Sequence, residues 1–244
     1  MEHPPQLSVV IPAFNEAECL GPLLGELQDV LDGSPPYEVL CVDDGSTDQT
    51  VQVLRSMRER YPELRVVRHR SRSGQSTALW TGISRATAPW VATLDADGQN
   101  DPRDLLRLLE ARDQSSEREE LWLVTGIRRR RRDNVLKRVS SRVANAVRSR
   151  LLGDGISDTG CGLKLMHRAR ILTIPSFDHM HRFLPALVMR SGGRVFTVEV
   201  GHRPRTAGTT KYGVRNRLFV GVVDLLGVLW LQRRTTHPII EEDL

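Results

Sequence analysis

The sequence predicts an α/β fold with a mostly parallel sheet covered by helices on both faces. Two observations carry this prediction. Short apolar strands alternate with helices of amphipathic pattern through the first half of the chain, and polar clusters directly follow three of the strands. In sheets of this kind, ligands bind beyond the carboxyl ends of the strands. The three polar clusters are therefore expected to meet at one edge of the sheet.

Each predicted strand is a short apolar run, and each predicted helix repeats apolar residues three or four positions apart. Strands are expected at 7–14, 37–42, 64–69, 89–94 and 121–126. Helices are expected between them at 16–31, 49–61, 74–86 and 102–112, and 111–120 is typical of an exposed loop. Asn15 is the expected cap of the first helix, and Ser46 or Thr47 that of the second, because their side chains accept hydrogen bonds from free backbone N–H groups.

The composition indicates a globular protein of a reducing compartment. Its 244 residues suffice for one large domain or two small ones. Three widely spaced cysteines, Cys19, Cys41 and Cys161, argue against a disulfide framework, and the first residues lack the pattern of a signal peptide. The net charge of +5 is modest, but the segment 128–150 is densely basic. Such a run could bind nucleic acid, an anionic membrane surface or a phosphorylated substrate.

The stretch TLDADGQNDP at 93–102 ends an apolar run in two acids one residue apart, followed by an amide. On an extended segment, the side chains of Asp95, Asp97 and Gln99 would point to the same side. Clustered oxygen ligands suit Mg²⁺ or Mn²⁺. An isolated pair of acids is also common in solvated turns, but the expected convergence of three polar clusters at one edge favours a metal site.

Four segments, in this order and spacing, resemble the family 2 glycosyltransferases, which have the GT-A fold with a Rossmann-like, mostly parallel sheet. They are SVVIPAFNE at 8–16, VDDGSTDQT at 42–50, SGQSTALWTGI at 73–83 and LDADGQNDP at 94–102. Three later segments, at 125–145, 157–168 and 202–213, resemble the polyprenyl-phosphate branch of that family, typified by dolichol-phosphate mannose synthase. The resemblance extends from Leu7 to Arg234 and so covers nearly the whole chain.

The resemblance implies a nucleotide-sugar donor. Its nucleoside pocket would be lined by Pro12, Phe14 and Glu16, with Asp43 or Asp44 holding the base or ribose. Its metal, Mg²⁺ or Mn²⁺, would be held by Asp95, Asp97 and Gln99. Its phosphates would be bound by Arg128, Arg205 and Lys211, and arginine suits this task because its planar group can bind phosphate oxygens bidentately.

The resemblance also places the acceptor phosphate at Ser141 and Arg142. Asp158 would orient a basic residue or the substrate, and a role as general base stays open. The implied catalytic residues are Asp97, Arg128, Asp158 and Lys211.

The implied reaction is an inverting transfer of a hexosyl unit from a nucleotide sugar to a polyprenyl phosphate of dolichyl or undecaprenyl type. GDP-mannose is the first expectation, with a UDP-sugar open. A phosphate monoester is mostly dianionic at neutral pH, because its second ionisation lies near pH ~6, and it needs no strong base to attack. The alternatives are a same-fold enzyme acting on a hydroxyl of a lipid or polysaccharide, and a basic nucleic-acid-binding protein. The latter is disfavoured because few aromatic residues interleave with the basic ones.

The apolar run 218–231 is interrupted by Asp224 and flanked by arginines. It is shorter than the ~20 residues that span a bilayer, so an amphipathic helix in the membrane interface is expected, with an ordinary core helix as the alternative. Some relatives carry two transmembrane helices after this region, whereas this chain stops at Leu244. The protein is therefore expected to be peripheral on the cytoplasmic face of the membrane. The expected division is a GT-A domain at 1–213, the interfacial helix at 214–234 and a tail at 235–244.

Two histidines in FDHMHRF, His179 and His181, lie two residues apart without neighbouring ligand clusters. They are expected to pack or cap rather than to bind a metal.

Overall fold

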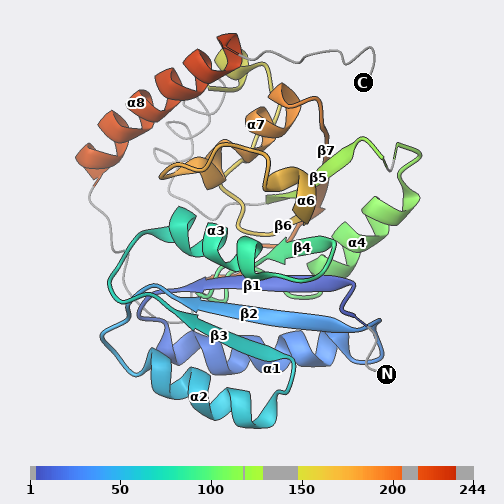
Figure 1. Ribbon diagram of the computed structural model, residues 1–244, viewed down its shortest axis with the longest axis vertical. Coiled ribbons are helices and arrows are strands. Elements are labelled where there is room, and N and C mark those ends of the chain that lie inside the picture. The colour runs from blue at the N-terminus through green and yellow to red at the C-terminus, as the bar shows by residue number, and fades with distance from the viewer. Residues whose placement is uncertain (1–3, 118, 129–147, 205–213, 235–244) are drawn as a thin grey trace, which may run out of the picture.

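The computed structural model describes residues 4–117, 119–128, 148–204 and 214–234, with side chains of the last segment described from residue 220 (Figure 1). Its centre is a seven-stranded sheet in the order β3-β2-β1-β4-β6-β5-β7. The strands are β1 (Leu7–Ala13), β2 (Tyr37–Asp43), β3 (Leu64–Arg68), β4 (Trp90–Thr93), β5 (Leu121–Arg128), β6 (Lys164–His167) and β7 (Arg194–Val200).

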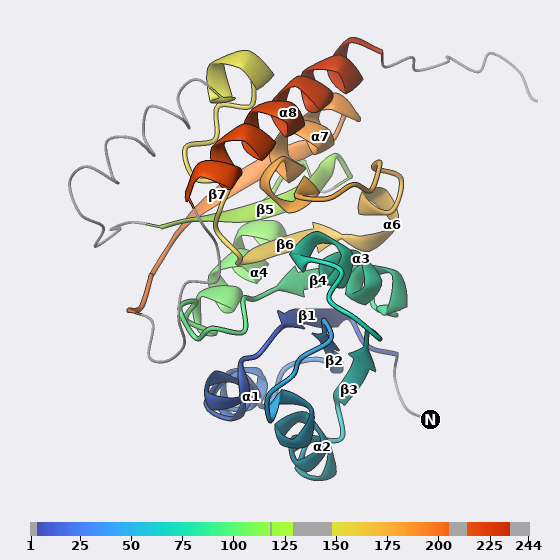
Figure 2. The same ribbon diagram turned by 90° about the vertical axis from the view of Figure 1, so that its left-hand side faces the viewer.

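The sheet is parallel except for β6, which runs antiparallel to both β4 and β5. Helices cover both of its faces (Figures 1 and 2). They are α1 (Ala17–Leu31), α2 (Thr50–Arg60), α3 (Gln75–Arg85), α4 (Asp104–Gln114), α6 (Arg168–Ile171), the short 3₁₀ helix η1 (Met180–Arg182), α7 (Leu184–Arg190) and α8 (Val214–Arg233). The predicted α/β class is confirmed.

Alternation along the buried strands produces two apolar cores. In β1, Val9 and Ile11 face the core that contains α1, α2 and α4, whereas Val10 faces the core that contains α3, α7 and α8. Successive strand residues point to opposite faces, so a strand buried on both faces reads as a continuous apolar run. This explains why the five predicted strands were visible as apolar runs. The two strands that were not predicted are β6, which has only four residues, and β7, which has a largely exposed face.

Three local predictions were wrong. Helix α4 continues to Gln114, so the expected loop at 111–120 begins later. Asn15 does not cap α1, because its φ of 53° is left-handed and unsuited to a cap. Its Oδ1 instead accepts a hydrogen bond from the backbone N–H of Thr47 at 2.8 Å.

Ser46 and Thr47 do not cap α2 either. Asp48 instead binds a free backbone N–H at the start of α2, because its Oδ1 accepts a hydrogen bond from the backbone N–H of Thr50 at 2.9 Å. The Ser46 hydroxyl accepts the backbone N–H of Asn15 at 2.9 Å. These side chains therefore tie the loop after β1 to the loop after β2, which holds together the edge of the sheet where ligands are expected.

The last helix, α8, spans 20 residues and packs against α7 and the second core through one face. Val228 is fully buried, and Leu225 and Leu229 are partly buried there. The opposite face carries exposed apolar side chains, namely Val222 (50% exposed), Val223 (52%), Leu226 (60%) and Trp230 (59%). The core-helix alternative therefore holds for one face of α8, and the placement of this helix in a membrane interface stays a prediction. Among the described residues, no helix combines the length and the apolar character needed to cross a membrane.

Candidate functional site

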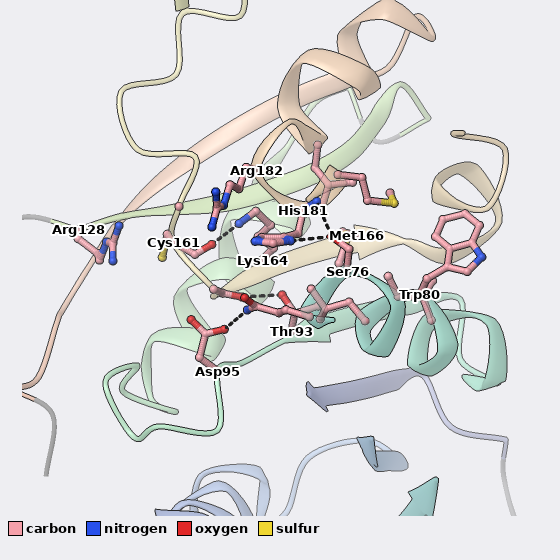
Figure 3. Close-up of a pocket in the computed structure, with 17 residues that line it drawn as sticks. Ser76, Trp80, Thr93, Asp95, Arg128, Cys161, Lys164, Met166, His181 and Arg182 are labelled. Atoms are coloured by element: carbon pink, nitrogen blue, oxygen red, sulfur yellow. Dashed lines mark hydrogen bonds between the residues drawn. The ribbon is translucent and has the colours of Figure 1, made fainter. Parts of the chain in front are cut away.

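A cavity of about 390 Å³ opens at the edge of the sheet where β4 and β5 end, beneath η1 and beside the start of α3 (Figure 3). Because β6 is antiparallel to β4, its first residue lies at this same edge, with Lys164 opposite Thr93. The cavity is lined by Gln75, Ser76, Leu79, Trp80, Ile83, Thr93, Asp95, Arg128, Gly160, Cys161, Gly162, Lys164, Met166, Met180, His181, Arg182 and Leu184. It thus unites segments that are far apart in the sequence.

Asp95 presents its carboxylate to this cavity just beyond β4 (Figure 3). Its Oδ1 accepts a hydrogen bond from Nε2 of Gln75 at 2.9 Å, and its backbone N–H donates to Oδ1 of Asn100 at 3.2 Å. A Cβ added at Gly162 would lie 2.1 Å from Oδ2 of Asp95. Only glycine at 162 therefore leaves room for the carboxylate in this position.

Asp97 and Gln99 do not continue the strand. Residues 96 and 97 form a turn, and Oδ1 of Asp97 accepts the backbone N–H of Gln99 at 3.1 Å. The expected alternation along an extended segment is thus wrong, because the chain turns after Leu94. Nε2 of Gln99 instead lies 3.4 Å from Nε2 of His202.

The metal assignment stays a prediction. Within the described ranges, no group of three or more His, Cys, Asp and Glu side chains is placed to hold a metal ion. The predicted ligand set contains two carboxylates, Asp95 and Asp97, and one amide. These are hard oxygen ligands of the kind that Mg²⁺ and Mn²⁺ take, and such ions also bind the phosphate oxygens of substrates. The residues present therefore fit a divalent cation that shares its coordination with a diphosphate.

Arg128 and Asp158 form a bidentate ion pair at the cavity. Nε and Nη2 of Arg128 each donate to one carboxylate oxygen of Asp158 at 2.7 Å. Burial acts to lower the pKa of Arg128, but the Asp158 carboxylate more than offsets this and the pKa is raised. A Cβ at Gly160 would lie 3.4 Å from Nη2 of Arg128, so this glycine lets the guanidinium lie close to the backbone. The predicted role of Asp158 in orienting a basic residue fits this geometry.

Asp43 and Asp44 are both buried and bonded within the protein. The two oxygens of Asp44 accept the backbone N–H groups of Ser73 and Gly74, each at 2.8 Å. Oδ1 of Asp43 accepts the backbone N–H of Ser46 at 3.1 Å. These carboxylates therefore hold the loops at the sheet edge, and their binding of a base or ribose stays a prediction.

Pro12, Phe14 and Glu16 are not among the residues that line the cavity of about 390 Å³. Phe14 lies beyond β1, with the Arg72 guanidinium 4.4 Å from the centre of its ring. The nucleoside pocket assigned to these residues stays a prediction. Ser141, Arg142, Arg205 and Lys211 lie outside the described residues.

Several lining residues, above all Lys164, were not predicted from the sequence. Lys164 is 4% exposed, and its Nζ donates to the backbone carbonyl oxygens of Thr159 and Cys161. Burial lowers its pKa, and the nearby carboxylates of Asp95 and Asp158 act in the opposite direction. The position of Lys164 directly after the glycine-rich segment GCGL could have indicated this role. Glycines let the backbone approach a ligand closely, and the side chains next to them then also lie near the ligand.

His181 was expected to pack or cap, but it lines the cavity. Its Nδ1 lies 2.7 Å from the Ser76 hydroxyl oxygen on α3. Burial and the neighbouring Arg182 hold the pKa of His181 well below its usual value of 6.5, so the ring is neutral at pH 7. His179 points elsewhere, with its Nδ1 3.1 Å from Oδ2 of Asp224 on α8. Ser76 and His181 are 105 positions apart, so no local pattern could have paired them.

Comparison with known proteins gives a consistent set of relatives. A family model described as "Glycosyl transferase family 2" matches residues 8–171. The dodecaprenyl-phosphate galacturonate synthase of Rhizobium johnstonii is 35% identical over 238 residues, which is 96% of this chain and 69% of that protein. The undecaprenyl-phosphate 4-deoxy-4-formamido-L-arabinose transferase of Edwardsiella ictaluri is 35% identical over 236 residues, again 96% of this chain and 69% of that protein.

Solved structures resemble the fold. Glucosyl-3-phosphoglycerate synthase of Mycobacterium tuberculosis, in complex with Mn²⁺, UDP and glucosyl-3-phosphoglycerate, matches with a TM-score of 0.68 at 18% identity, over 93% of this chain and 80% of that one. Mannosyl-3-phosphoglycerate synthase of Rubrobacter xylanophilus matches with a TM-score of 0.71 at 17% identity, over 98% of this chain and 78% of that one. At these identities the likeness concerns the fold, which is the expected GT-A arrangement.

Proposed function

Because the chain belongs to glycosyl transferase family 2, we propose that it transfers a sugar from a nucleotide sugar to the phosphate group of a polyprenyl phosphate. Both relatives described above act, by their names, on dodecaprenyl or undecaprenyl phosphate. Family membership makes the chain a glycosyltransferase and removes the alternative of a nucleic-acid-binding protein.

One observation carries the proposal. The Asp95 carboxylate and the Arg128 guanidinium, which is paired with Asp158, line a single cavity at the carboxyl edge of the sheet, where sheets of this class bind their ligands. Carboxylates there suit a divalent cation and a guanidinium suits phosphate, so the two features together fit a nucleoside diphosphate.

The donor diphosphate would lie between these groups. Asp95, Asp97 and Gln99 would hold Mg²⁺ or Mn²⁺, and the cation when bound would neutralise negative charge that develops on the diphosphate. A solved structure of the same fold holds Mn²⁺ together with UDP. Arg128 would bind a phosphate oxygen, and Asp158 would fix the direction of its guanidinium. Lys211 and Arg205 are proposed to add further charge on the donor side.

The acceptor phosphate would attack the anomeric carbon in line with the leaving diphosphate. A bond forms between a phosphate oxygen and the anomeric carbon, the bond to the diphosphate oxygen breaks, and the anomeric centre inverts. The acceptor dianion carries its own electron pair, so no side chain has to remove a proton. The engagement of Asp158 with Arg128 supports a positioning role over that of a general base. Ser141 and Arg142 are proposed to hold the acceptor phosphate.

The donor sugar is open to experiment. GDP-mannose was the first expectation, whereas the names of the two relatives contain galacturonate and formamido-arabinose. We therefore propose that donors other than GDP-mannose be tested first, with UDP among the nucleotides.

A lipid acceptor requires access to a membrane. We propose that residues 1–213 form the catalytic domain and that the helix at 214–234 lies in the interface of the cytoplasmic leaflet. The exposed apolar face of α8 supports this, because Trp and aliphatic side chains at an interface enter the boundary of headgroups and acyl chains.

The test is transfer by the purified protein. Nucleotide sugars are supplied with Mn²⁺ or Mg²⁺ and a short polyprenyl phosphate, and the lipid product is isolated. The expected product carries its sugar through a phosphate and releases it in mild acid. Transfer only to hydroxyl acceptors, giving an acid-resistant glycoside, would support the same-fold alternative and overturn the proposal.

A further inference from the structure

Three nitrogen-bearing side chains meet in the middle of the cavity. Figure 3 places Asp95 and Arg128 toward one end and Trp80 toward the other, with Lys164, His181 and Arg182 between them. If the donor diphosphate lies beside Asp95 and Arg128, its sugar is one bond further along. The sugar would therefore face this central group.

Lys164 is buried and lacks a carboxylate ion-pair partner among the described residues. Its ammonium donates to two backbone carbonyl oxygens, which are neutral, and it makes no ion pair with a carboxylate in the described part of the chain. A buried charge is costly unless it is paired, so an anionic ligand beside this side chain would stabilise its ammonium form. Arg182 lines the same cavity from η1, on the side of Lys164 (Figure 3). Together they place two cationic groups where a neutral hexose would offer only hydroxyls.

The same region also has the groups that a pyranose ring needs. Ser76 and His181 are hydrogen-bonded to each other across the cavity, and both kinds of side chain can bond sugar hydroxyls. Trp80 and other apolar side chains offer surfaces for the C–H faces of a ring. The cavity therefore suits a sugar rather than a bare anion.

An acceptor phosphate is a second source of negative charge for these cationic groups. The effect of the Arg182 variant on the KM for the polyprenyl phosphate, described below, separates the two sources.

We propose that this cavity selects a donor whose sugar bears a carboxylate, a hexuronic acid, and that Arg182 and Lys164 bind that carboxylate. This inference rests on the proposed transfer from a nucleotide sugar. It adds the chemical class of the sugar and the residues that recognise its carboxylate. Arg182 is the better residue to test, because Lys164 is also bonded to the backbone that shapes the site.

The experiment uses matched donors that differ only in the carboxylate. UDP-galacturonate is compared with UDP-galactose, and GDP-mannuronate with GDP-mannose, on the full chain with Mn²⁺. Binding is measured by calorimetry and transfer to a short polyprenyl phosphate by product formation. For the nucleotide that binds, the uronate donor is expected to have a Kd about ten- to a hundredfold lower, and a kcat/KM higher by the same factor, than the hexose donor. This corresponds to one or two charge-assisted contacts.

The variant is Arg182→Met, which keeps much of the side-chain length and removes the charge. This variant is expected to reduce the preference for the uronate donor over the hexose donor by about tenfold or more, both in affinity (1/Kd) and in kcat/KM. Arg58→Met is the control, since Arg58 is an exposed arginine on α2 outside the cavity, and this variant should keep the wild-type ratio.

The outcomes separate the two proposals. If neutral hexose is transferred to polyprenyl phosphate as well as the uronate, the transfer stands and the carboxylate inference is wrong. If Arg182→Met raises the KM for the polyprenyl phosphate and leaves the donor ratio unchanged, Arg182 serves the acceptor and the inference is again wrong. If neither nucleotide series binds, the carboxylate inference is wrong, and the proposed function is decided by the transfer assay with other nucleotide sugars.

Discussion

Asp158 accepts three hydrogen bonds from Arg128, from Nε and Nη2 at 2.7 Å each and from the backbone N–H at 3.2 Å. Both side chains are largely buried, with exposed fractions of 11% and 12%. A carboxylate held in this way aims the guanidinium and is itself restrained. The two members of this pair should therefore act together.

We expect Asp158 to act through Arg128, and a double-mutant cycle tests this. Arg128→Gln should lower kcat/KM for the donor by roughly ten- to a hundredfold, because one charge-assisted phosphate contact is lost. Asp158→Asn should have a similar or smaller effect, and the double variant should be no worse than Arg128→Gln alone. A further large loss of kcat in the double variant would instead give Asp158 its own part in the chemistry.

The metal prediction is tested at Asp97. Asp97→Asn keeps an oxygen that can accept the N–H of Gln99 and removes only the charge, whereas Asp97→Ala removes both. Both variants should lose about a hundredfold or more in turnover, since a cation at a diphosphate supplies several kcal/mol of charge stabilisation. They should also bind Mn²⁺ more weakly in calorimetry. Full activity of either variant in EDTA would remove the metal assignment.

Gly162 should be intolerant of a side chain. In Gly162→Ala the new Cβ would lie 2.1 Å from the Asp95 carboxylate, so the carboxylate or the strand must shift. We expect a loss of donor turnover with a folded protein, measured by kinetics and circular dichroism. Gly25→Ala is the matched control. Nothing lies within 4 Å of its added Cβ on helix α1, and the change should be neutral or stabilising by up to about 1 kcal/mol. Equal activity of both variants would contradict the close contact.

The outer face of α8 should govern binding to vesicles. Leu226→Ser with Trp230→Ser removes exposed apolar side chains, and burial of each in a bilayer is worth up to about 2–3 kcal/mol. The variant should sediment less with anionic phospholipid vesicles while keeping its melting temperature.

The control for α8 follows from its packing. Leu225 and Leu229 contact the second core, so Leu225→Ser with Leu229→Ser should lower the melting temperature. If vesicle binding persists after the outer face is changed, α8 is not the membrane-binding element.

His181 should make stability fall in mild acid. Burial lowers its pKa in the folded protein below the value of 6.5 that applies when unfolded. The unfolded chain therefore binds more protons as the pH falls below about 6.5, so the stability contribution is present above that pH and is lost below it. Denaturation by urea at pH 7.5 and pH 5 measures the difference, and His181→Gln should reduce it. An unchanged difference would show that other groups, such as His167, whose pKa is also lowered by burial, dominate.

The first five strands and the helices between them could be predicted from the sequence. The spacing of apolar residues that distinguishes a strand from a helix is a local property of the chain. The positions of Asp95 and Arg128 at the cavity were also predictable, since side chains after parallel strands gather at one edge. Asp158, which pairs with Arg128, was implied only by the resemblance to the family. Asp43 and Asp44 lie at that edge as well, but their carboxylates hold the loops after β2 and before α3. The motif located them without revealing these bonds.

The tertiary structure alone decided what surrounds the site. The pairing of Thr93 with Lys164 depends on an antiparallel strand of four residues inserted between β4 and β5, which has no strong period of its own. The contact of Ser76 with His181 joins positions 105 apart. The two faces of α8 could not be distinguished from an apolar run, because which side chains are buried depends on where α7 and the second core lie. Local propensity determined the elements of this protein, whereas long-range packing determined which of their side chains share the cavity.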